Sequence, residues 1–454
     1  MKHYDLAIIG SGPGGYVAGL YAARRGLTVC VIEKDLVGGT CLNRGCIPTK
    51  AMLHSASLFS RIKEAAGHGI KTSPPSVDFP VVFKRKEEIV LKLRTGIETL
   101  FRANKIDLIK GNAKFCAPRR IVAGKEEIEA SSSIIATGSR AVVPPGIYVD
   151  ETIILTSDGI LGMKELPGSI LVIGGGVIGC EFATLFNAFG VTVTIVEALD
   201  RILIGQSRET SRKMELLFKK RGIAVHTSSK AEAVVRKDGG VETTLSNGRR
   251  IVSDKLLMAI GRMPYIEGLE EASAGIRTER GRIEVDSFLR TGAKNIYAIG
   301  DCIPGPLLAH RASYDGILAC DNIMGAGRRA DYSHIPNCVY TDPEIASVGL
   351  TEDDAGKTVR DARTVKFPYL ASGKAFLMDR TGGFIKITGD PSGKLLGVEI
   401  FGEGACDLIG EASLAVHAGL SVKDLAGTVH GHPTLSEIYQ EAAHIFCGTA
   451  IHSI

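Results

Sequence analysis

The chain has 454 residues, which is too long for one hydrophobic core and fits roughly two to four domains. Apolar residues make up 44% and charged residues 23%, as in an ordinary soluble globular protein, and the net charge of +4 gives no reason to expect nucleic acid or an anionic membrane as a partner. The longest apolar stretch, 169–186, contains four glycines and Glu181, so a membrane span is not expected.

The chain opens with a pattern that occurs a second time further along. Residues 6–33 predict an apolar strand, a glycine turn, a helix and a second strand that ends at Glu33. Residues 170–197 repeat this order, and the second strand there leads into Glu197. A βαβ unit present twice predicts two dinucleotide-binding folds in tandem, and therefore an α/β protein.

The segments between and after these units predict further helices, strands and a boundary. Helices are expected over residues 48–66 and 81–104, followed by short strands up to Ala136. The Pro-Pro-Gly sequence at 144–146 indicates a domain boundary. From about residue 336, alternating strands and long helical patterns predict a separate α+β domain.

The first glycine turn has the G-x-G-x-x-G spacing over residues 10–15. In this motif the first glycine makes the turn, the second lets the backbone approach a pyrophosphate, and the third packs helix against strand. The N–H groups at the start of the helix bind phosphate, and Glu33 is positioned to accept hydrogen bonds from ribose hydroxyls. The glycines alone are weak evidence, but their place between strand and helix, with a carboxylate at the expected distance, predicts a dinucleotide site.

The second glycine turn, at 174–179, has Glu197 as its acidic partner. This carboxylate would repel a 2′-phosphate, so NAD(H) is expected in preference to NADP(H). Arg201 is near enough in sequence to be a phosphate ligand, but a surface or ion-pairing arginine is the commoner explanation.

The ten cysteines fall into two groups. Eight are scattered without metal-ligand spacing, so no metal site is predicted and most are expected to be small buried hydrophobes. With no export signal, a reducing cytosol is the expected location. Cys41 and Cys46 are different, because they lie only five positions apart.

Cys41 and Cys46 can bond only where the helix is distorted. Five residues of regular helix would separate the Cα atoms by roughly 7.5 Å along the axis, whereas a disulfide needs about 4.4–6.8 Å. Gly45 offers the freedom to distort, and Pro48 removes one backbone donor. A disulfide in such a place is expected to be easily reduced, and a nearby helix N-terminus favours the thiolate. On spacing alone, two ordinary core cysteines that never pair are an equally good explanation.

A histidine and a carboxylate form the last candidate pair. His432 is followed by Pro433 and, five positions after the histidine, by Glu437. Across a proline turn into a helix the two can form a dyad, in which the carboxylate fixes the imidazole tautomer and raises its basicity. A buried structural histidine is the usual alternative, and His430 is a candidate for that role.

The run 41–50 resembles the redox motif of the pyridine nucleotide-disulfide oxidoreductases. Leu42, Ile47 and Thr49-Lys50 are most similar to the members that oxidise dihydrolipoamide. The similarity covers essentially the whole chain and includes residues 136–138, 259–262, 300–301 and 308–310.

The resemblance implies two cofactors and a reaction. FAD would bind the first unit and NAD the second, and protein-bound dihydrolipoamide would be oxidised to lipoamide through a Cys41–Cys46 disulfide and FAD, with hydride transfer to NAD⁺. His432 would be the catalytic base with Glu437 as its partner. The implied catalytic residues are Cys41, Cys46, His432, Glu437, and an ion pair of Lys50 and Glu181 beside the flavin N5.

Cofactor-binding residues are expected from the glycine motifs and from the resemblance together. Asp301 would bond the ribityl chain, and the helix start near Ala309 would face the pyrimidine end of the flavin. The expected residues are Gly10, Gly12, Pro13, Gly14, Gly15, Glu33, Lys34, Gly39, Thr40, Lys50, Ala113, Thr137, Gly138, Asp301, Leu308, Ala309, Gly174, Gly176, Val177, Ile178, Gly179, Glu197, Ala231, Gly261 and Arg262.

The resemblance also implies domains and partners. In the family the histidine dyad comes from the other subunit, so a homodimer with shared active sites is implied. The dithiol would arrive on a lipoyl-bearing protein of a 2-oxoacid dehydrogenase or of the glycine cleavage system. The implied domains are an FAD-binding domain at 1–145, an NAD-binding domain at 146–268, a central segment completing the FAD domain at 269–335, and an interface or dimerisation domain at 336–454.

Several alternatives remain open at the level of sequence. Glutathione and trypanothione reductases usually need NADPH and positive residues where Glu197 stands, and mercuric reductase needs a C-terminal cysteine pair that 449–454 lacks. A structural flavoprotein subunit of a larger complex is a further alternative, although such a subunit has little reason to keep both cysteines and the dyad. Departures from the family pattern are Tyr265, Gly431 and Cys180, of which the first two carry no chemistry.

Overall fold

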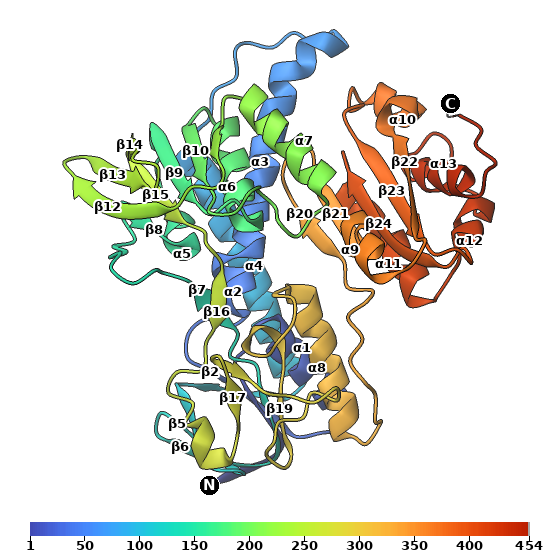
Figure 1. Ribbon diagram of the computed structural model, residues 1–454. Helices are drawn as coiled ribbons and strands as arrows, with labels where there is room; N and C mark the ends of the chain where they lie inside the picture. Colours follow the sequence, from blue (N-terminus) through green and yellow to red (C-terminus); the bar gives the residue numbers. More distant parts are fainter. Residues whose placement is uncertain (453–454) are drawn as a thin grey trace. The chain divides into compact units, whose positions relative to one another are not determined.

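The computed structural model describes residues 1–452, and the chain divides into two compact units (Figure 1). Unit 1 comprises residues 1–58, 62–167 and 255–330. Unit 2 comprises residues 59–61, 168–254 and the chain from 331 onward. No helix within residues 1–452 has the length and apolar character needed to cross a bilayer.

The centre of unit 1 is a mainly parallel sheet. Its strands are runs of valine and isoleucine that are buried on both faces, as expected where helices cover a parallel sheet. Leu6 pairs with Val29, and Ile9 pairs with both Ile32 and Ile135. The parallel strands are β1 (Lys2–Ile9), β2 (Val29–Glu33), β3 (Asp107–Lys110), β6 (Glu126–Ile135) and β19 (Ile296–Ala298), and β4 (Ala113–Ala117) and β5 (Arg120–Ala123) extend the sheet in antiparallel order.

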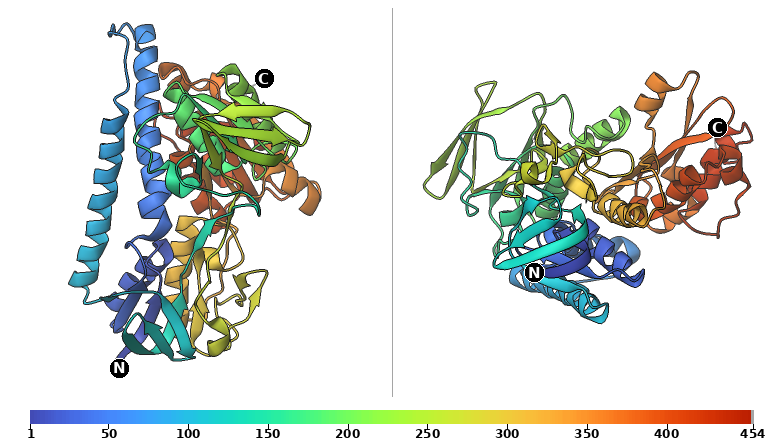
Figure 2. Two further views of the ribbon diagram at one scale, coloured as in Figure 1. Left: turned by 90° about the vertical axis from the view of Figure 1, so that its left-hand side faces the viewer. Right: turned by 90° about the horizontal axis from the view of Figure 1, so that it is seen from below.

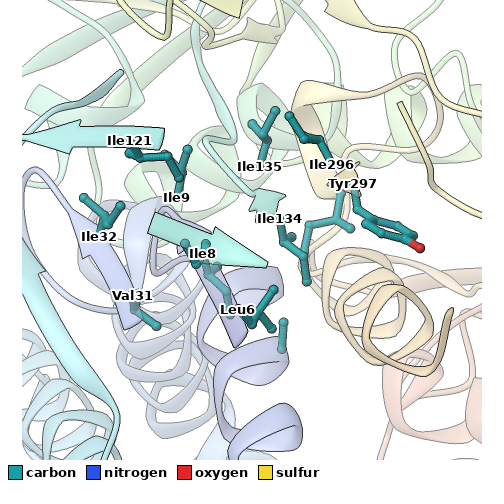
Figure 3. Packing of buried hydrophobic residues seen from close by; sticks show 14 of the residues in the cluster. Leu6, Ile8, Ile9, Val31, Ile32, Ile121, Ile134, Ile135, Ile296 and Tyr297 are labelled. Carbon is teal, nitrogen blue, oxygen red and sulfur yellow. The ribbon is translucent and has the colours of Figure 1, made fainter. Parts of the chain in front are cut away.

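The core of unit 1 forms where these strands bring their aliphatic side chains together. Figure 3 shows side chains from β1, β2, β5, β6 and β19 meeting in one cluster. Ile8, Ile134 and Val31 have no exposed surface. Burial of a side chain of this size stabilises a fold by about 1.5–3 kcal/mol, so the strands that carry the glycine turn are firmly held.

Two helices pack closely against each other beside the first glycine turn. α1 (Pro13–Arg24) and α8 (Ala309–Ile323) lie side by side (Figure 1). A Cβ on Gly14 would lie 2.9 Å from the Ala312 carbonyl oxygen, and one on Gly316 would lie 2.6 Å from the Gly14 oxygen. Glycine at both positions therefore lets the two helix backbones touch.

Two long helices follow the second strand of unit 1. α3 (Cys46–Glu64) and α4 (Phe79–Ala103) agree within two residues with the helices predicted over 48–66 and 81–104 (Figure 2). Arg85 on α4 donates a 3.2 Å hydrogen bond to the Ala51 carbonyl on α3. The other elements of unit 1 are α2 (Gly39–Arg44), η1 (Ala65–His68), β7 (Ser139–Ala141), β8 (Ile154–Leu155), α5 (Ser157–Ile160), β15 (Lys255–Met258), β16 (Arg262–Pro264), η2 (Glu271–Ala274), β17 (Thr278–Glu279), β18 (Arg282–Ile283) and η3 (Gly300–Cys302).

Unit 2 begins with the second βαβ unit. Its strands pair in parallel, with Val193 next to Ile170 and Ile195 next to Val225. The elements are β9 (Ser169–Ile173), α6 (Val177–Ala188), β10 (Thr192–Val196), α7 (Arg208–Lys220) and β11 (Ala224–His226), followed by an antiparallel sheet of β12 (Ala231–Lys237), β13 (Gly240–Leu245) and β14 (Arg250–Ser253).

The later part of unit 2 is an antiparallel sheet covered by helices, as the alternating pattern after residue 336 predicted. The strand order is β20-β21-β24-β23-β22, and the apolar faces of the sheet and helices form one core. The elements are β20 (Asn337–Val339), β21 (Ile345–Gly349), α9 (Glu352–Thr358), β22 (Arg363–Pro368), η4 (Tyr369–Ala371), α10 (Gly373–Leu377), β23 (Phe384–Gly389), β24 (Leu395–Phe401), α11 (Ala405–His417), α12 (Val422–Gly427) and α13 (Glu437–Phe446).

Candidate active site

The glycines of the first turn divide into those that pack and one that leaves space. Gly10 has φ +101°, and a Cβ on it would lie 2.4 Å from the Ala136 carbonyl oxygen. A Cβ on Gly15 would lie 1.9 Å from the Gly10 oxygen. At Gly12, by contrast, the nearest described atom to such a Cβ is the Gly39 Cα, 4.0 Å away. The first and third glycines of the motif thus close the turn, and the second leaves room for a ligand.

The N-terminus of α1 and the end of β2 supply groups that fit a dinucleotide. α1 begins at Pro13 after Gly12, and no described side chain caps its N–H groups, so they are available to phosphate. Glu33 is 7% exposed and accepts hydrogen bonds from the Ser11 N–H at 2.8 Å, the Ser11 Oγ at 2.6 Å and the Asp35 N–H at 2.8 Å. A carboxylate has about four acceptor positions, so Glu33 is oriented and can still accept a ribose hydroxyl.

Asp301 lies in η3 and is held by Ser139, a residue that the sequence analysis did not single out. Ser139 Oγ donates to Asp301 Oδ2 at 2.5 Å, and the Arg262 Nε donates to Ser139 Oγ at 2.8 Å. Arg262, expected among the cofactor ligands, is therefore placed against Ser139. Ser139 directly follows Thr137 and Gly138, which were expected to bind the cofactor, and that position was the signal that could have found it.

A buried ion pair fixes the loop between η3 and α8. The Arg311 guanidinium and Asp315 Oδ2 are 2.9 Å apart, and both side chains are fully buried. Arg311 also donates to the carbonyls of Gly300 at 3.1 Å and Pro304 at 2.9 Å. The pair therefore sets the positions of both Asp301 and the start of α8. The i,i+4 spacing of opposite charges on a helix was its only signal.

The remaining residues expected beside FAD lie at the ends of elements in unit 1. Lys34 is stacked on Tyr265, with its Nζ 3.4 Å from the ring centroid, so the residue that departs from the family pattern holds an expected ligand. The structure places the others at the starts of α2, α3, β4 and α8 and in the turn after β6: Gly39, Thr40, Lys50, Ala113, Thr137, Gly138, Leu308 and Ala309.

The two cysteines of the redox motif lie on either side of a break in the helix. α2 ends at Arg44, α3 begins at Cys46, and Gly45 between them has φ −146° and ψ −115°. A Cβ on Gly45 would lie 2.9 Å from the Thr40 oxygen and 3.2 Å from the Cys41 Cα. Any side chain at this position would therefore push the two turns apart.

The break brings the two sulfur atoms together and makes the pair asymmetric. Both cysteines carry thiols in the structure, and the Cys41 thiol is hydrogen-bonded to Cys46. That hydrogen bond and burial raise the pKa of the Cys41 thiol far above its ordinary value. Cys46 is the first residue of the long helix α3, where the helix dipole favours negative charge. Cys41 therefore keeps its proton while Cys46 is the better thiolate.

The second glycine turn, in unit 2, has the same geometry as the first. Gly174 has φ +109°, and a Cβ on Gly179 would lie 2.0 Å from the Gly174 oxygen. A Cβ on Gly176 would meet no described atom within 4 Å other than those of its chain neighbours. Gly176 is the N-cap of α6, whose first residues are Val177 and Ile178, and no described side chain caps this helix start. The groups that would bind a pyrophosphate are therefore present here as well.

Two acidic residues of unit 2, Glu197 and Glu181, accept hydrogen bonds from backbone N–H groups. Glu197 accepts from Gly175 N–H at 2.6 Å and from Leu199 N–H at 2.8 Å. Arg201 lies 3.5 Å from Asp200, which favours the ion-pairing interpretation over a phosphate ligand. Glu181 is 3% exposed and accepts from the Tyr340 N–H at 3.0 Å, a partner that the sequence did not indicate.

Two further expected residues, and Cys180 as a departure from the family pattern, have less defined roles. Ala231 opens β12 in unit 2, and Gly261 stands just before β16 in unit 1. Burial raises the pKa of the Cys180 thiol well above its ordinary value, and its Sγ donates to the Gly175 carbonyl at 3.3 Å. Cys180 thus supports the glycine turn as a protonated thiol.

The histidine dyad is formed in unit 2. His432 Nδ1 and Glu437 Oε1 are 2.9 Å apart, and the Thr434 N–H donates to Glu437 Oε2 at 2.9 Å. Burial opposes ionisation, but the bonds from His432 and Thr434 lower the pKa of Glu437 below its ordinary value. His430, by contrast, has a 5% exposed side chain and lies 2.9 Å from Glu411, as expected of a structural histidine.

The two kinds of glycine in the second turn predict different effects of alanine. Gly179→Ala is expected to destabilise the protein by about 1–3 kcal/mol or more, because the new Cβ overlaps the Gly174 oxygen. Gly176→Ala is expected to unfold at nearly the wild-type temperature but to raise the KM for NAD⁺ about tenfold, equivalent to about 1.4 kcal/mol. Thermal unfolding and initial rates separate the two. Equal loss of stability in both variants would contradict the interpretation that Gly179 packs the turn while Gly176 leaves room for the cofactor.

Comparison with known proteins gives a consistent result over the full chain. Residues 4–316 match the family model described as pyridine nucleotide-disulphide oxidoreductase, and residues 335–443 match the dimerisation domain of that family. No group of three or more His, Cys, Asp or Glu within residues 1–452 could hold a metal ion.

The chain is similar in sequence to named enzymes and similar in fold to solved structures. The chain is 41% identical to the dihydrolipoyl dehydrogenase of Geobacillus stearothermophilus, over 99% of this chain and 97% of that one. It is 39% identical to the dihydrolipoyl dehydrogenase of Halobacterium salinarum, over 99% and 98%. LpdA from Mycobacterium tuberculosis superposes with a TM-score of 0.92 at 29% identity, covering 98% of this chain and 100% of that chain. The HOCl-induced flavoprotein disulfide reductase RclA from Escherichia coli has a TM-score of 0.89 at 30% identity, covering 97% and 100%.

Proposed function

The chain belongs to the pyridine nucleotide-disulphide oxidoreductase family, and on that premise we propose that it is an NAD-dependent dihydrolipoyl dehydrogenase. The observation that carries this proposal is the broken helix at Gly45, which brings the Cys41 thiol onto Cys46. The family matches confirm that the chain resembles this family, as the redox motif predicted. They also confirm the predicted α/β fold with a dimerisation domain.

FAD and NAD are the cofactors. Gly12 and the open start of α1 fit the pyrophosphate of FAD, Glu33 fits its ribose, and Asp301 is the candidate for its ribityl chain. Gly176 and Glu197 fit NAD in the same manner. When bound, FAD and NAD⁺ supply the two-electron chemistry that re-forms the disulfide between the cysteines and carries the electrons away.

The side chains of this protein account for the thiol chemistry. His432, oriented by Glu437, removes a proton from one thiol of the substrate, and the resulting thiolate attacks Cys41 in its disulfide with Cys46. Cys46 leaves as a thiolate at the start of α3, where negative charge is favoured. The second substrate thiol then displaces Cys41 and leaves as a cyclic disulfide, and Cys41 takes up the proton that its raised pKa favours.

The dimerisation domain supports a homodimer. We further propose that the two subunits share active sites, because the His432 side chain is 81% exposed in the single chain and a catalytic base needs a surface to complete its site. The proposed substrate is a lipoyl-bearing protein of a 2-oxoacid dehydrogenase or the glycine cleavage system, and the proposed location is the cytoplasm. We retain as a proposal the division into domains at 1–145, 146–268, 269–335 and 336–454.

Activity assays with two alternative pairs of substrates test the proposal. Purified protein is expected to show the visible absorption of oxidised flavin and to form NADH from NAD⁺ and dihydrolipoamide. It is expected not to oxidise NADPH with glutathione disulfide. The reverse pattern would assign the chain to the glutathione reductases, and flavin without either activity would favour a structural subunit.

The choice of nicotinamide cofactor gives a further prediction. Glu197→Gln removes a negative charge but keeps an oxygen that can accept from the Gly175 N–H. The ratio of kcat/KM for NAD⁺ to that for NADP⁺ is expected to fall about tenfold or more, because the repulsion of a 2′-phosphate is lost. Glu232→Gln, an exposed change on β12, is the matched control. An unchanged ratio would show that Glu197 does not set the preference.

A further inference from the structure

A second pair of cysteines lies in unit 2, where strand β20 meets the start of helix α11. Cys338 Sγ lies 4.0 Å from the Cys406 carbonyl oxygen. Cys406 Sγ lies 3.8 Å from the Val339 oxygen and 3.7 Å from the Ile345 oxygen, and its thiol is hydrogen-bonded to Cys338. Each sulfur atom therefore contacts the other cysteine or its immediate neighbour.

The other scattered cysteines have a different environment. Cys30, Cys180, Cys302 and Cys320 are buried, as expected from the sequence, and Cys320, for example, donates to the Ala18 carbonyl at 3.4 Å. That expectation is wrong for the other four, because Cys338 and Cys406 are half-buried and the remaining two, Cys116 and Cys447, are exposed. A small reagent can therefore reach the second pair, whereas packing shields the buried cysteines.

We propose that Cys338 and Cys406 form a second redox-active dithiol, which small-molecule disulfides convert into an intramolecular disulfide and which thiols reduce again. The proposal goes beyond dihydrolipoyl oxidation, because neither cysteine belongs to the redox motif or to either glycine turn.

The backbone around both cysteines is already fixed. Cys338 pairs with Ala346 in the β20–β21 ladder. On the other side, the Cys406 N–H donates to Glu344 Oε2 at 3.0 Å, and α11 begins at Ala405 after Gly404, which has φ +72°. Backbone hydrogen bonds therefore hold both residues in place, with the Cys406 thiol hydrogen-bonded to Cys338, so the two side chains are neighbours on fixed main chains.

The charges around the pair indicate which sulfur reacts first. The hydrogen bond to Cys338, burial and the Glu344 carboxylate raise the pKa of the Cys406 thiol far above its ordinary value. The Glu344 carboxylate, which accepts from the Cys406 N–H, places negative charge beside Cys406, so Cys406 keeps its proton and Cys338 is the better nucleophile.

The exchange balances with a disulfide RSSR as oxidant. The Cys338 thiolate attacks one sulfur of RSSR, forming a mixed disulfide and releasing RS⁻. The Cys406 thiol gives up its proton, and its sulfur attacks Cys338 Sγ, which forms the intramolecular bond and releases the second RS⁻. Two electrons pass from the cysteine sulfurs to RSSR, and the two cysteine protons end on two RSH molecules.

Mass spectrometry of the intact holoenzyme tests the proposal with 2-hydroxyethyl disulfide as the probe. After oxidation, alkylation and tryptic digestion, peptides 330–357 and 395–423 are expected as one linked species, two hydrogens lighter than their sum. Alkylation of both cysteines is expected to be lost and to return after dithiothreitol. The Cys406→Ser variant is expected to stop at a mixed disulfide on Cys338, and Cys447→Ser is expected to behave as wild type.

The measurement does not depend on dithiol turnover. A Cys41→Ser/Cys46→Ser variant is expected to form the same linked species, so failure of the proposed enzyme activity would not affect the result. The proposal is overturned if both cysteines stay open to alkylation after the oxidant, or if each carries only its own mixed disulfide.

Discussion

Replacing Cys41 by serine is expected to lower dihydrolipoamide oxidation by at least about 10³-fold, because the sulfur that the substrate attacks is gone. FAD binding is expected to stay intact. Cys41 lies within α2, and the glycine turn, Glu33 and Asp301 are held by bonds that do not involve its side chain. Rates with dihydrolipoamide and the flavin content of the purified variant measure the two effects.

Two comparisons make this prediction specific. Cys116→Ser changes an exposed cysteine of β4 and is expected to leave turnover unchanged. NADH-dependent reduction of an artificial electron acceptor such as ferricyanide is expected to persist in Cys41→Ser, since it requires no dithiol. Full dihydrolipoamide activity in Cys41→Ser would show that another group receives the substrate thiolate.

The elements that carry the glycine turns could be predicted, because local sequence determines them. The apolar run before Gly10 and the glycines after it specify strand, turn and helix over a few consecutive residues. β19 could not be predicted in the same way. It is a strand of three residues, 296–298, which pairs with β6 far away in the sequence. Its position depends on the tertiary fold, and no periodic pattern can develop over so short a strand.

The candidate site shows the same division between local and distant contacts. The spacing of Cys41 and Cys46 indicated that the two could bond only where a helix is distorted, and Gly45 was the residue expected to allow it, which is where α2 and α3 separate. Ser139 against Asp301 and Tyr340 against Glu181 join residues more than a hundred positions apart. Such partners have no spacing rule, because the fold and not the local chain brings them together.

The second largest effect is expected when His432 is replaced by glutamine. Without the base, the substrate dithiol must lose its proton to water, so kcat/KM for dihydrolipoamide is expected to fall by about 10²–10⁴-fold. Because the pKa of Glu437 is lowered, its carboxylate stays ionised through the neutral range, and Glu437→Gln removes that charge from beside the imidazole. Glu437→Gln is therefore expected to reduce the rate as well, but by less than His432→Gln.

A second histidine–glutamate pair provides the matched control. His452 Nδ1 lies 2.8 Å from Oε1 of Glu441, which is on helix α13 together with Glu437. The side chain of His452 is 68% exposed. If any exposed imidazole paired with a carboxylate sufficed, His452→Gln would also reduce the rate, whereas we expect no change. Reduction of ferricyanide by NADH is expected to survive in His432→Gln, because that reaction removes no proton from a dithiol. Equal losses in both assays would instead indicate that His432 supports the fold of the dimerisation domain, and the role of base would have to be assigned to another residue.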